Sequence, residues 1–331
     1  MRSRGLLFSL LVAVCVAGAA AYVALAAGGD DRVATLTDAQ PAAPAGADRP
    51  LPADLRLIVR ARDRLDLRLP GRVYVVDPAH PDRRKEHPAE CMRVHVSAGR
   101  GLCLSIAPSG VDFRVSLLDR DLTAGTTIPL AGVPSRTRVS PDGRYGAVTT
   151  FVTGDSYTTS GEFSTRTLLL DMAAGKMITD LERFRVLKDG RELDAPDHNF
   201  WGVTFAQDSD RFYATLGTGE HHYLVRGSVR DRTLTVLRDG VECPSLSPDG
   251  TQIGFKASAG GDKWRFSVLD LETLREHPLS EQRSIDDQLE WLDDRHVAYG
   301  DGRDVWMARA DGGGEPERLV RGADSPAAIC G

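Results

Sequence analysis

The sequence predicts an all-β protein, a six-bladed β-propeller with four antiparallel strands in each blade, preceded by one N-terminal hydrophobic helix. A turn of sequence Ser-Pro-Asp-Gly occurs at residues 140–143 and again at 247–250, and each copy is followed by a short apolar run. Other short apolar runs end in Asp, and the two ends of the folded region complement each other. A unit of about 40 residues with one tight turn and a few short strands is typical of a propeller blade.

The turns recur at intervals that suit four-stranded blades. Full or degraded copies lie at Ser97, Ser140, Ala206, Ser247 and Leu292, which gives spacings of 43, 66, 41 and 45 residues. In each unit the innermost strand, A, ends at the turn and strand B follows it. The spacing of 66 residues indicates an insertion in one unit, and blades are expected near residues 53–88, 89–132, 133–183, 184–240, 241–281 and 282–322.

Strand C of each unit is an apolar run closed by Asp. The copies are residues 73–77, 115–119, 167–171, 267–270 and 305–311, with a looser copy at 223–231. Apolar strands are expected because both faces of a blade pack against its neighbours. At the ends of the domain, residues 323–330 resemble a strand A without a strand B, whereas residues 55–61 resemble a strand B without a strand A. Pairing these two segments would close the ring and leave no open edge.

The first 54 residues are expected to lie outside the propeller. Residues 5–27 carry no charge and follow Arg2 and Arg4, so they predict a helix long enough to span the ~30 Å apolar slab of a membrane, with the N-terminus in the cytoplasm. Ala24-Leu25-Ala26 also fits a signal-peptidase site, which leaves cleavage near Ala26 and secretion as the alternative to a signal anchor. Residues 28–54, rich in Ala, Pro and Gly, predict a disordered linker to an extracytoplasmic propeller at residues 55–331.

These motifs resemble those of the TolB-like family of β-propellers, more narrowly its envelope-anchored actinobacterial members. The resemblance rests on the two Ser-Pro-Asp-Gly turns, the variant Trp291-Leu292-Asp293-Asp294 and the Asp that ends strand C, and it covers about residues 55–331. It implies an accessory or transport-associated role in the cell envelope with no reaction attached. Propeller motifs are specific for the fold and carry little information about activity.

Composition and motifs exclude several function classes. A net charge of -6 argues against nucleic acid as the main partner, because a phosphate-binding domain usually has a clustered basic face. Arg72, Arg83, Arg84 and Lys85 form a small basic cluster, which is interpreted as a solvated edge strand. The chain has no Gly-x-Ser-x-Gly elbow, His-Glu-x-x-His helix or phosphate-binding glycine loop, so no catalytic residue is assigned. His221 and His222 are neighbours on a strand and point to opposite faces, which argues against a shared metal ion. No cofactor is predicted, although a cation such as calcium in the channel is an alternative.

The predicted binding site is the channel mouth on the face opposite the turns. There the connections from the last strand of one blade to strand A of the next converge, and their polar or aromatic residues are Glu90, Arg136, Asp197, His198, Asn199, Trp201, Glu242, Asp286, Asp287, Gln288 and Asp324. Such an acidic rim fits a cation, a basic peptide or a sugar. The simpler interpretation is that these groups hydrate a wet channel. The insertions at residues 153–165 and 187–199 are further candidates, because long loops often carry binding residues.

The cysteines suggest one disulfide. Cys91 and Cys103 are expected on strands A and B of one blade, where a regular hairpin would offset them by about three residues and a bulge at the Ser97 turn would bring them together. Cys243 is expected nearly across the ring from Cys91.

Together these features predict a monomeric, non-enzymatic binding or scaffold module for an envelope protein, a peptide or a cell-wall component, which contacts the membrane only through its N-terminal segment. One alternative is a hydrolase or lyase that uses Asp197, His198, Asp286 and Asp287 as acid, base or metal ligands. A second is a purely structural module that spaces partners in the envelope.

Overall fold

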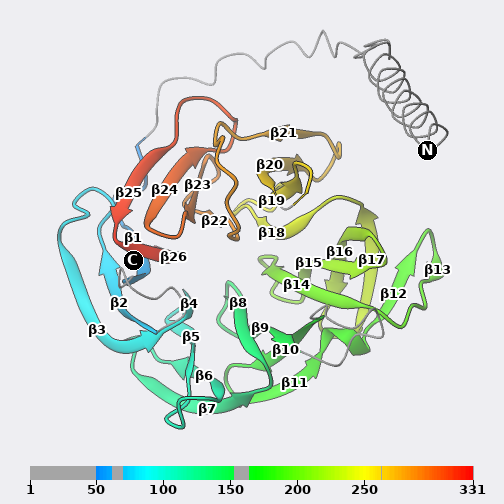
Figure 1. Ribbon diagram of the computed structural model, residues 1–331, viewed down its shortest axis with the longest axis horizontal. Coiled ribbons are helices and arrows are strands. Elements are labelled where there is room, and N and C mark those ends of the chain that lie inside the picture. The colour runs from blue at the N-terminus through cyan, green and yellow to red at the C-terminus, as the bar shows by residue number, and fades with distance from the viewer. Residues whose placement is uncertain (1–49, 62–69, 153–163, 262, 331) are drawn as a thin grey trace, which may run out of the picture. The chain divides into compact units, whose positions relative to one another are not determined.

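The computed structural model describes residues 50–61, 70–152, 164–261 and 263–330, and these residues form a ring of six β-sheets around a central channel (Figure 1). The six-bladed propeller is therefore confirmed. Residues 1–49 lie outside the described residues, so the predicted N-terminal helix and linker stay predictions. Within the described ranges, no helix is long and apolar enough to cross a membrane.

The first three blades follow the predicted boundaries closely. Blade 1 consists of β1 (Leu55–Ala61), β2 (Gly71–Val76), β3 (Arg84–Cys91) and β26 (Ala323–Cys330). Blade 2 consists of β4 (Arg93–Ser97), β5 (Arg100–Ile106), β6 (Phe113–Leu118) and β7 (Ala124–Leu130). Blade 3 consists of β8 (Val133–Val139), β9 (Tyr145–Val152), β10 (Ser164–Asp171) and β11 (Lys176–Asp180), followed by the short 3-10 helix η1 (Leu181–Arg183).

The fourth sheet has six strands instead of the expected four. Its blade is built from β14 (Asn199–Phe205), β15 (Arg211–Thr218), β16 (His221–Ser228) and β17 (Thr233–Arg238), and its outer edge is extended by β12 (Arg185–Lys188) and β13 (Arg191–Glu192). β12 pairs in parallel with β17. Residues 185–192, which fall in the 66-residue interval, therefore form a hairpin on the outer edge of the blade, whereas residues 153–163 of the predicted insertion lie outside the described residues.

The last two blades return to four strands. Blade 5 consists of β18 (Glu242–Leu246), β19 (Gln252–Ser258), β20 (Trp264–Asp270) and β21 (Glu276–Pro278). Blade 6 consists of β22 (Glu290–Trp291), β23 (His296–Gly300), β24 (Asp304–Arg309) and β25 (Glu317–Arg321). The core lies between adjacent blades: Tyr213 and Leu224 of blade 4 pack with Ile253, Phe255 and Leu269 of blade 5.

The Ser-Pro-Asp-Gly turns are fixed by hydrogen bonds within each motif. Ser140 Oγ accepts a hydrogen bond from the Tyr145 amide at 2.9 Å and donates to Asp142 Oδ1 at 2.7 Å. Asp142 Oδ1 in turn accepts from the Arg144 amide at 2.9 Å. Gly143 has a φ of 68°, a left-handed conformation that glycine adopts at little cost. Asp142 thus caps its own turn, as a structural interpretation of the motif predicts.

The last strand closes the ring. β26 pairs antiparallel with β1, so that Leu55 lies opposite Cys330 and Ala61 lies opposite Ala323. We call this pairing the closing pair. The predicted closure is confirmed, and β26 supplies the innermost strand of blade 1.

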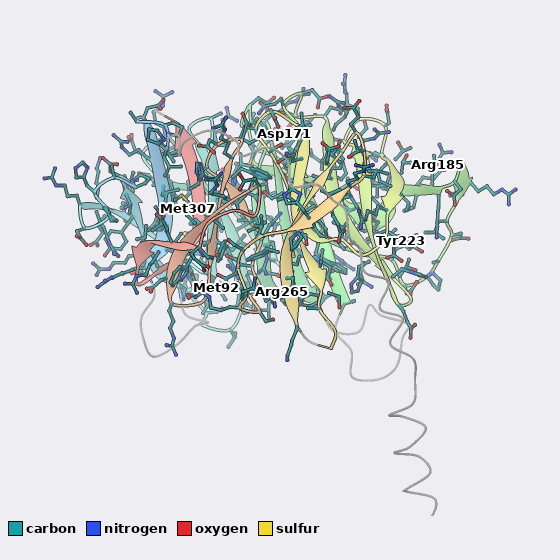
Figure 2. All side chains as sticks on the ribbon, turned by 90° about the horizontal axis from the view of Figure 1, so that it is seen from above. Met92, Asp171, Arg185, Tyr223, Arg265 and Met307 are labelled. Carbon is teal, nitrogen blue, oxygen red and sulfur yellow. A yellow bond between two sulfur atoms is a disulfide. The ribbon has the colours of Figure 1, made fainter. Side chains whose placement is uncertain are left out.

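The two faces of the ring are distinct when the molecule is seen from the side (Figure 2). Asp171, at the end of a strand C, lies toward one face, whereas Met92 and Arg265 lie toward the other. Met92 belongs to the connection between blades 1 and 2, and Arg265 lies near the start of a strand C. The face that carries Met92 and Arg265 is therefore the channel mouth.

Cys91 and Cys103 form a disulfide, with their Cα atoms 5.3 Å apart. The pairing is the one that the sequence suggested, but the expected mechanism is wrong. The turn after Ser97 is a regular two-residue connection, with Ser97 opposite Arg100 and positive φ at Ala98 and Gly99. Cys91 instead ends β3, because the chain leaves that strand at Met92. The disulfide therefore joins blade 1 to blade 2.

Candidate functional site

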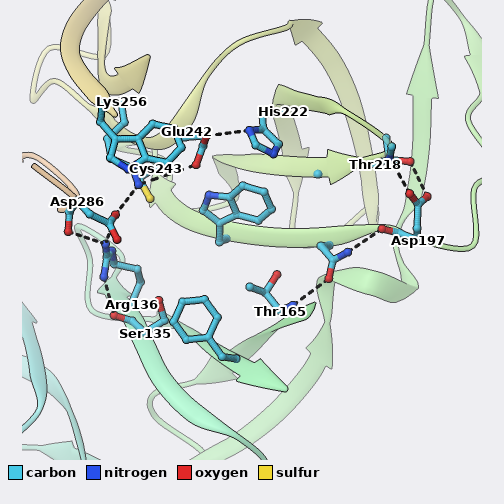
Figure 3. Close-up of a pocket in the computed structure, with 16 residues that line it drawn as sticks. Ser135, Arg136, Thr165, Asp197, Thr218, His222, Glu242, Cys243, Lys256 and Asp286 are labelled. Carbon is cyan, nitrogen blue, oxygen red and sulfur yellow. Dashed lines mark hydrogen bonds and ion pairs between the residues drawn. The ribbon is translucent and has the colours of Figure 1, made fainter. Parts of the chain in front are cut away.

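A pocket of about 380 Å³ opens at the channel mouth, among residues of blades 3, 4 and 5 and of the connection that enters blade 6 (Figure 3). We call it the mouth pocket. Its lining residues are Ser135, Arg136, Phe151, Thr165, Asp197, Asn199, Trp201, Gly217, Thr218, Gly219, His222, Glu242, Cys243, Lys256, Trp264 and Asp286. This volume lies within the range of about 300–1,000 Å³ that is usual for small-molecule sites.

One wall of the mouth pocket is a row of alternating charges (Figure 3). His222 Nδ1 lies 2.8 Å from Glu242 Oε1, and Lys256 Nζ lies 3.9 Å from Glu242 Oε2. Lys256 Nζ also lies 2.5 Å from Asp286 Oδ1, which Arg136 Nη2 approaches to 3.2 Å. Each carboxylate therefore has two cationic neighbours, and the row holds the side chains in fixed orientations.

The row of charges shifts the pKa values of His222, Lys256 and Asp286 toward their ionised forms. The hydrogen bond to Glu242 raises the pKa of His222 above its usual 6.5. Burial alone would lower the pKa of Lys256, but Cys243 and Asp286 outweigh burial and raise it. Partial loss of hydration beside the channel wall would raise the pKa of Asp286, but Arg136 and Lys256 lower it. Each charged form is favoured because an opposite charge lies within ion-pair distance.

Aromatic side chains form the apolar part of the lining. The Trp201 ring lies against Gly217, where a Cβ atom would come within 2.7 Å of the indole, so that a larger residue would displace the ring. The His222 ring meets Trp201 edge-on, with ring centroids 5.3 Å apart. Lys256 Nζ lies 4.4 Å from the centroid of Trp264, a cation–π contact. Gly217 is therefore a requirement for the position of Trp201.

The opposite wall is rigid and already hydrogen-bonded. Asp197 accepts hydrogen bonds from the Thr218 hydroxyl at 2.7 Å and the Gly219 amide at 2.6 Å. Asn199 Oδ1 accepts from the Thr165 amide at 2.9 Å, and its Nδ2 donates to the Asp197 carbonyl at 2.8 Å. These contacts tie the entry to β14 to the adjoining loops. Asp197 thus acts as a structural cap in this conformation.

The inner strands of blades 3, 4 and 5 are each interrupted by a β-bulge at the mouth pocket. The register shifts between Pro134 and Arg136 in β8, between Trp201 and Thr204 in β14, and between Glu242 and Ser245 in β18. Gly202 and Cys243, inside two of these bulges, have φ values of 64° and 48°. A bulge re-aims side chains and ends regular pairing, and these three turn Arg136, Trp201 and Glu242 into the lining of one pocket.

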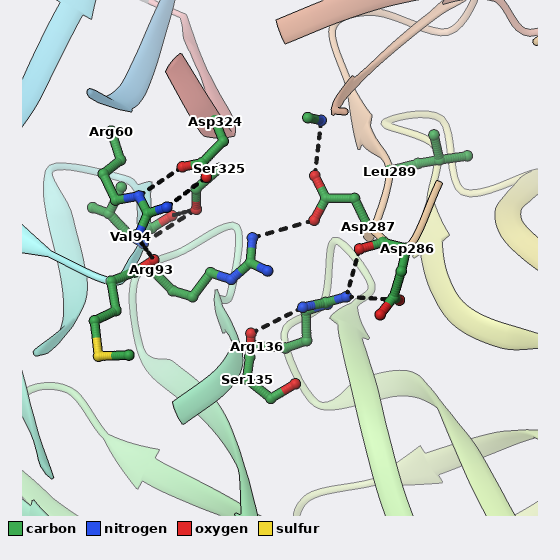
Figure 4. A network of polar contacts seen from close by, with 12 residues as sticks. Arg60, Arg93, Val94, Ser135, Arg136, Asp286, Asp287, Leu289, Asp324 and Ser325 are labelled. Atoms are coloured by element: carbon green, nitrogen blue, oxygen red, sulfur yellow. Dashed lines mark hydrogen bonds and ion pairs between the residues drawn. The ribbon is translucent and has the colours of Figure 1, made fainter. Parts of the chain in front are cut away.

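A second polar network fills the channel beside the mouth pocket (Figure 4). Arg60 donates to both carboxylate oxygens of Asp324, at 2.7 and 2.5 Å. Arg93 Nη1 lies 3.3 Å from Asp287 Oδ1, while Asp287 Oδ2 accepts from the Gly300 amide at 2.8 Å. Arg60 and Asp324 bridge the two strands of the closing pair within blade 1. Asp287 links neighbouring blades, because it joins the entry of blade 6 to Arg93 of blade 2.

Another buried ion pair in the channel joins Glu290 of β22 to Arg138 of β8. His95 Nε2 lies 3.7 Å from Glu290 Oε2, and Glu290 Oε1 accepts a hydrogen bond from the Ala328 amide at 2.9 Å. Burial would raise the pKa of Glu290, but Arg138 and then His95 lower it to about 2. Glu290 therefore connects blades 2, 3 and 6 with the closing strand.

The structure brings together part of the predicted set. Six of the predicted residues line the mouth pocket: Arg136, Asp197, Asn199, Trp201, Glu242 and Asp286. Asp287 and Asp324 belong to the channel network, and Gln288 donates hydrogen bonds to the Val203 and Pro244 carbonyls. Glu90 is exposed at the end of β3, opposite Arg72. His198 is absent from the pocket lining and meets Phe200 edge-on, with ring centroids 6.2 Å apart.

The sequence analysis missed His222, Lys256 and Trp264 as lining residues. Lys256 could have been predicted from strand pairing. It lies opposite Glu242 in the β18–β19 pairing, as Arg60 lies opposite Asp324 in the matching β1–β26 pairing. The expected acidic rim is therefore a row of paired charges. Among the described residues, no three His, Cys, Asp or Glu side chains are grouped so that they could hold a metal ion. A channel cation such as calcium stays a prediction.

Comparison with known proteins finds similarity in structure and none in sequence. No family model matches the chain, and no curated protein matches it. TolB from Acinetobacter baumannii superimposes with a TM-score of 0.57 and 16% identity, over 84% of this chain and 68% of that chain. The fold is that of a TolB-like propeller. A chain of a nidogen/laminin complex gives a TM-score of 0.57 with 10% identity, over 83% of this chain and 98% of that chain.

The putative TolB from Agrobacterium tumefaciens is also similar, with 13% identity over 82% of this chain and 91% of that chain and a TM-score of 0.48. At identities this low the comparisons establish the fold, and the same fold carries many unrelated functions. The function has to be argued from the site.

Proposed function

We propose that this chain is a non-enzymatic binding module that holds a component of the cell envelope at its channel mouth. In this proposal the N-terminal segment anchors an extracytoplasmic, monomeric propeller to the membrane, or is cleaved to release it. The ligand is an envelope protein, a peptide or a cell-wall component, and the role is accessory or transport-associated. The structural similarity to TolB and to a chain of a nidogen/laminin complex supports a binding or scaffold role.

The observation that carries the proposal is the mouth pocket itself. Its three bulged inner strands present aromatic and charged side chains that are held in place before any ligand arrives. Preorganised side chains lose little conformational entropy on binding, which favours affinity. A channel that only has to stay wet needs no such arrangement of Trp201 and Trp264.

The proposed hydrolase or lyase set is not supported by the geometry. Asp197 is held by Thr218 and Gly219, and Asp287 is held by Arg93 and Gly300. His198 and Asp287 are absent from the pocket lining, whereas Asp197 and Asp286 belong to it. A general acid and base must both reach one substrate, and these four side chains do not share a pocket.

Site-specific photo-crosslinking in intact cells tests the proposal. A benzophenone amino acid is placed at Phe151, which lines the mouth pocket and is 37% exposed. The matched control places it at Leu274, which is 43% exposed between β20 and β21, on the opposite face. We expect a defined adduct from position 151 and none from position 274.

The same experiment is repeated with Trp201→Ala in the chain that carries the probe at position 151. We expect the adduct to disappear while the melting temperature stays unchanged. Equal labelling from both positions, or an adduct that survives Trp201→Ala, would contradict a binding role for the mouth. In that case a purely structural spacer would explain the protein better.

A further inference from the structure

We propose that the mouth pocket recognises a neutral saccharide, with one sugar ring packed against Trp201. The inference rests on the proposed binding function and names the chemical class of its ligand. Three independent features carry it: the aromatic surface, the internally balanced charge and the bulges that interrupt the inner strands.

The aromatic surface suits the apolar face of a sugar ring. Two of the four tryptophans of the chain, Trp201 and Trp264, line this one pocket. Within the described part of the chain, neither indole N–H has a hydrogen-bond partner, so both are available as donors to a ligand. An amphipathic ring with a polar edge binds ligands that combine an apolar face with hydrogen-bonding groups, and sugars have that character.

The charges of the lining cancel each other. When His222 is protonated, three cations face three anions across the lining: Arg136, His222 and Lys256, and Asp197, Glu242 and Asp286. A charged ligand would gain little net attraction and would compete with the existing ion pairs. The paired side chains still have hydrogen-bonding capacity, because a carboxylate accepts at up to about four sites. The Asp286 side chain remains 68% exposed, so it is accessible to a hydroxyl group.

The bulges disfavour an extended peptide. A peptide that adds a strand to a propeller needs a regular edge of free backbone groups on an inner strand. Each of the inner strands β8, β14 and β18 loses its regular register at the mouth pocket. What the pocket presents instead is a set of side chains from several elements: Asn199 of β14, Asp286 of the connection to blade 6, and the Thr165 and Thr218 hydroxyls of β10 and β15. Recognition by side chains with both donors and acceptors fits a ligand rich in hydroxyl groups.

Titration calorimetry of the full-length chain, in a detergent without a sugar head group, tests the inference. The neutral probes are methyl β-glucoside and N,N′-diacetylchitobiose; glucuronate and glucosamine are the charged comparators. We expect the neutral probes to bind with dissociation constants on the order of 1 mM and the charged ones at least several-fold more weakly.

Variants locate the binding. We expect Trp201→Ala to raise the dissociation constants of the neutral probes about tenfold, which corresponds to the loss of roughly 1.4 kcal/mol of stacking energy. Trp201→Phe should retain part of the affinity, and it controls for misfolding. Trp306→Phe is the matched control, because Trp306 lies in β24 of blade 6, under Arg283 and outside the mouth pocket.

The outcomes separate this inference from the proposed function. If no neutral probe binds, or if Trp201→Ala binds them as well as the unaltered chain does, the saccharide inference is overturned. If the probe at Phe151 still captures a partner that no saccharide displaces, the binding function stands and its ligand is a protein or peptide. If neither capture nor saccharide binding is seen, both the function and the inference fall.

Discussion

Replacing Glu290 by Gln tests the account of the channel most directly. The Glu290 side chain is 9% exposed and forms an ion pair with Arg138. Its other carboxylate oxygen accepts a hydrogen bond from the Ala328 amide of the closing strand. Gln keeps the size of the side chain and an acceptor for the amide, but it removes the charge. The Arg138 guanidinium would then be buried without its ionic partner, which is costly in a low-dielectric interior.

The magnitude follows from the pKa of Glu290. A lowering from 4.5 to about 2 corresponds to about 3 kcal/mol in the free energy of unfolding at neutral pH, because one pH unit is worth about 1.4 kcal/mol. Removal of one partner of a buried pair costs about 3 to 5 kcal/mol in other proteins. We therefore expect Glu290→Gln to lower the unfolding free energy by about 3 to 5 kcal/mol at pH 7, and the melting temperature by roughly 6 to 15 °C.

The dependence of the unfolding free energy on pH tests the same prediction independently. A carboxylate with a lowered pKa stabilises the folded state above its unfolded pKa, and this stability is lost as the pH falls through the folded pKa. The unaltered protein should therefore lose about 3 kcal/mol between pH 4.5 and about 2 through this group. In urea titrations at a series of pH values, the unfolding free energy of the variant should not show this decrease at low pH.

The matched control is Glu86→Gln, which removes a surface ion pair with Arg72. The Glu86 side chain is 48% exposed and the Arg72 side chain is 59% exposed. Exposed pairs contribute about 0 to 1 kcal/mol, so this variant should behave like the unaltered protein. If Glu290→Gln also stays within 1 kcal/mol at pH 7, or keeps the full decrease at low pH, the channel pair does not hold the blades as we describe.

Three further predictions concern other parts of the ring. Cys91→Ala with Cys103→Ala should lower the unfolding free energy by about 3 kcal/mol, read from urea midpoints, because the disulfide closes a loop with a sequence separation of 12; an unchanged midpoint would contradict this. Phe255→Ala, in the core between blades 4 and 5, should cost about 3 to 5 kcal/mol by the same assay, and a cost below 1 would mean that this core is loosely packed. The raised pKa of His222 means that its bond to Glu242 stabilises the fold below about pH 6.5 and weakens as the pH rises through the raised value. An NMR titration should place the pKa of His222 above 6.5, and Glu242→Gln should lower it; no difference between the two proteins would refute the assignment.

The sequence was sufficient for the ring because its signals are local. The turn at residues 140–143 depends on the dihedral preferences of Gly143 and the capping of Asp142, and both can be inferred from four letters. The closing pair could also be inferred, because residues 323–330 resemble a strand A and residues 55–61 resemble a strand B. Buried apolar runs such as that around Phe255 then fixed the number of blades.

The site was less accessible because it depends on register. His222 and Trp264 lie at the start of strand C of their blades, and whether such a residue faces the mouth pocket depends on the register of the strands around it. The positive φ at Cys243 inside one of those bulges has no sequence signal, since non-glycine residues rarely adopt it. The sequence predicted the Cys91–Cys103 pairing correctly but placed both cysteines in one blade. Cys91 belongs to blade 1 because β3 extends to it, and the sequence has no signal for where that strand ends.

The closing pair makes the two ends of the domain depend on each other. Arg60 and Asp324 are 264 positions apart in the chain, yet they form one buried ion pair with two hydrogen bonds. Every strand between them has to be in place before this contact forms, so we expect ring closure to be a late and slow event in folding. Loss of β26 would expose the inner edge of β1 and so create a surface on which copies could associate. The disulfide would still hold blade 1 to blade 2 in such an opened molecule, which would limit the damage to one gap in the ring.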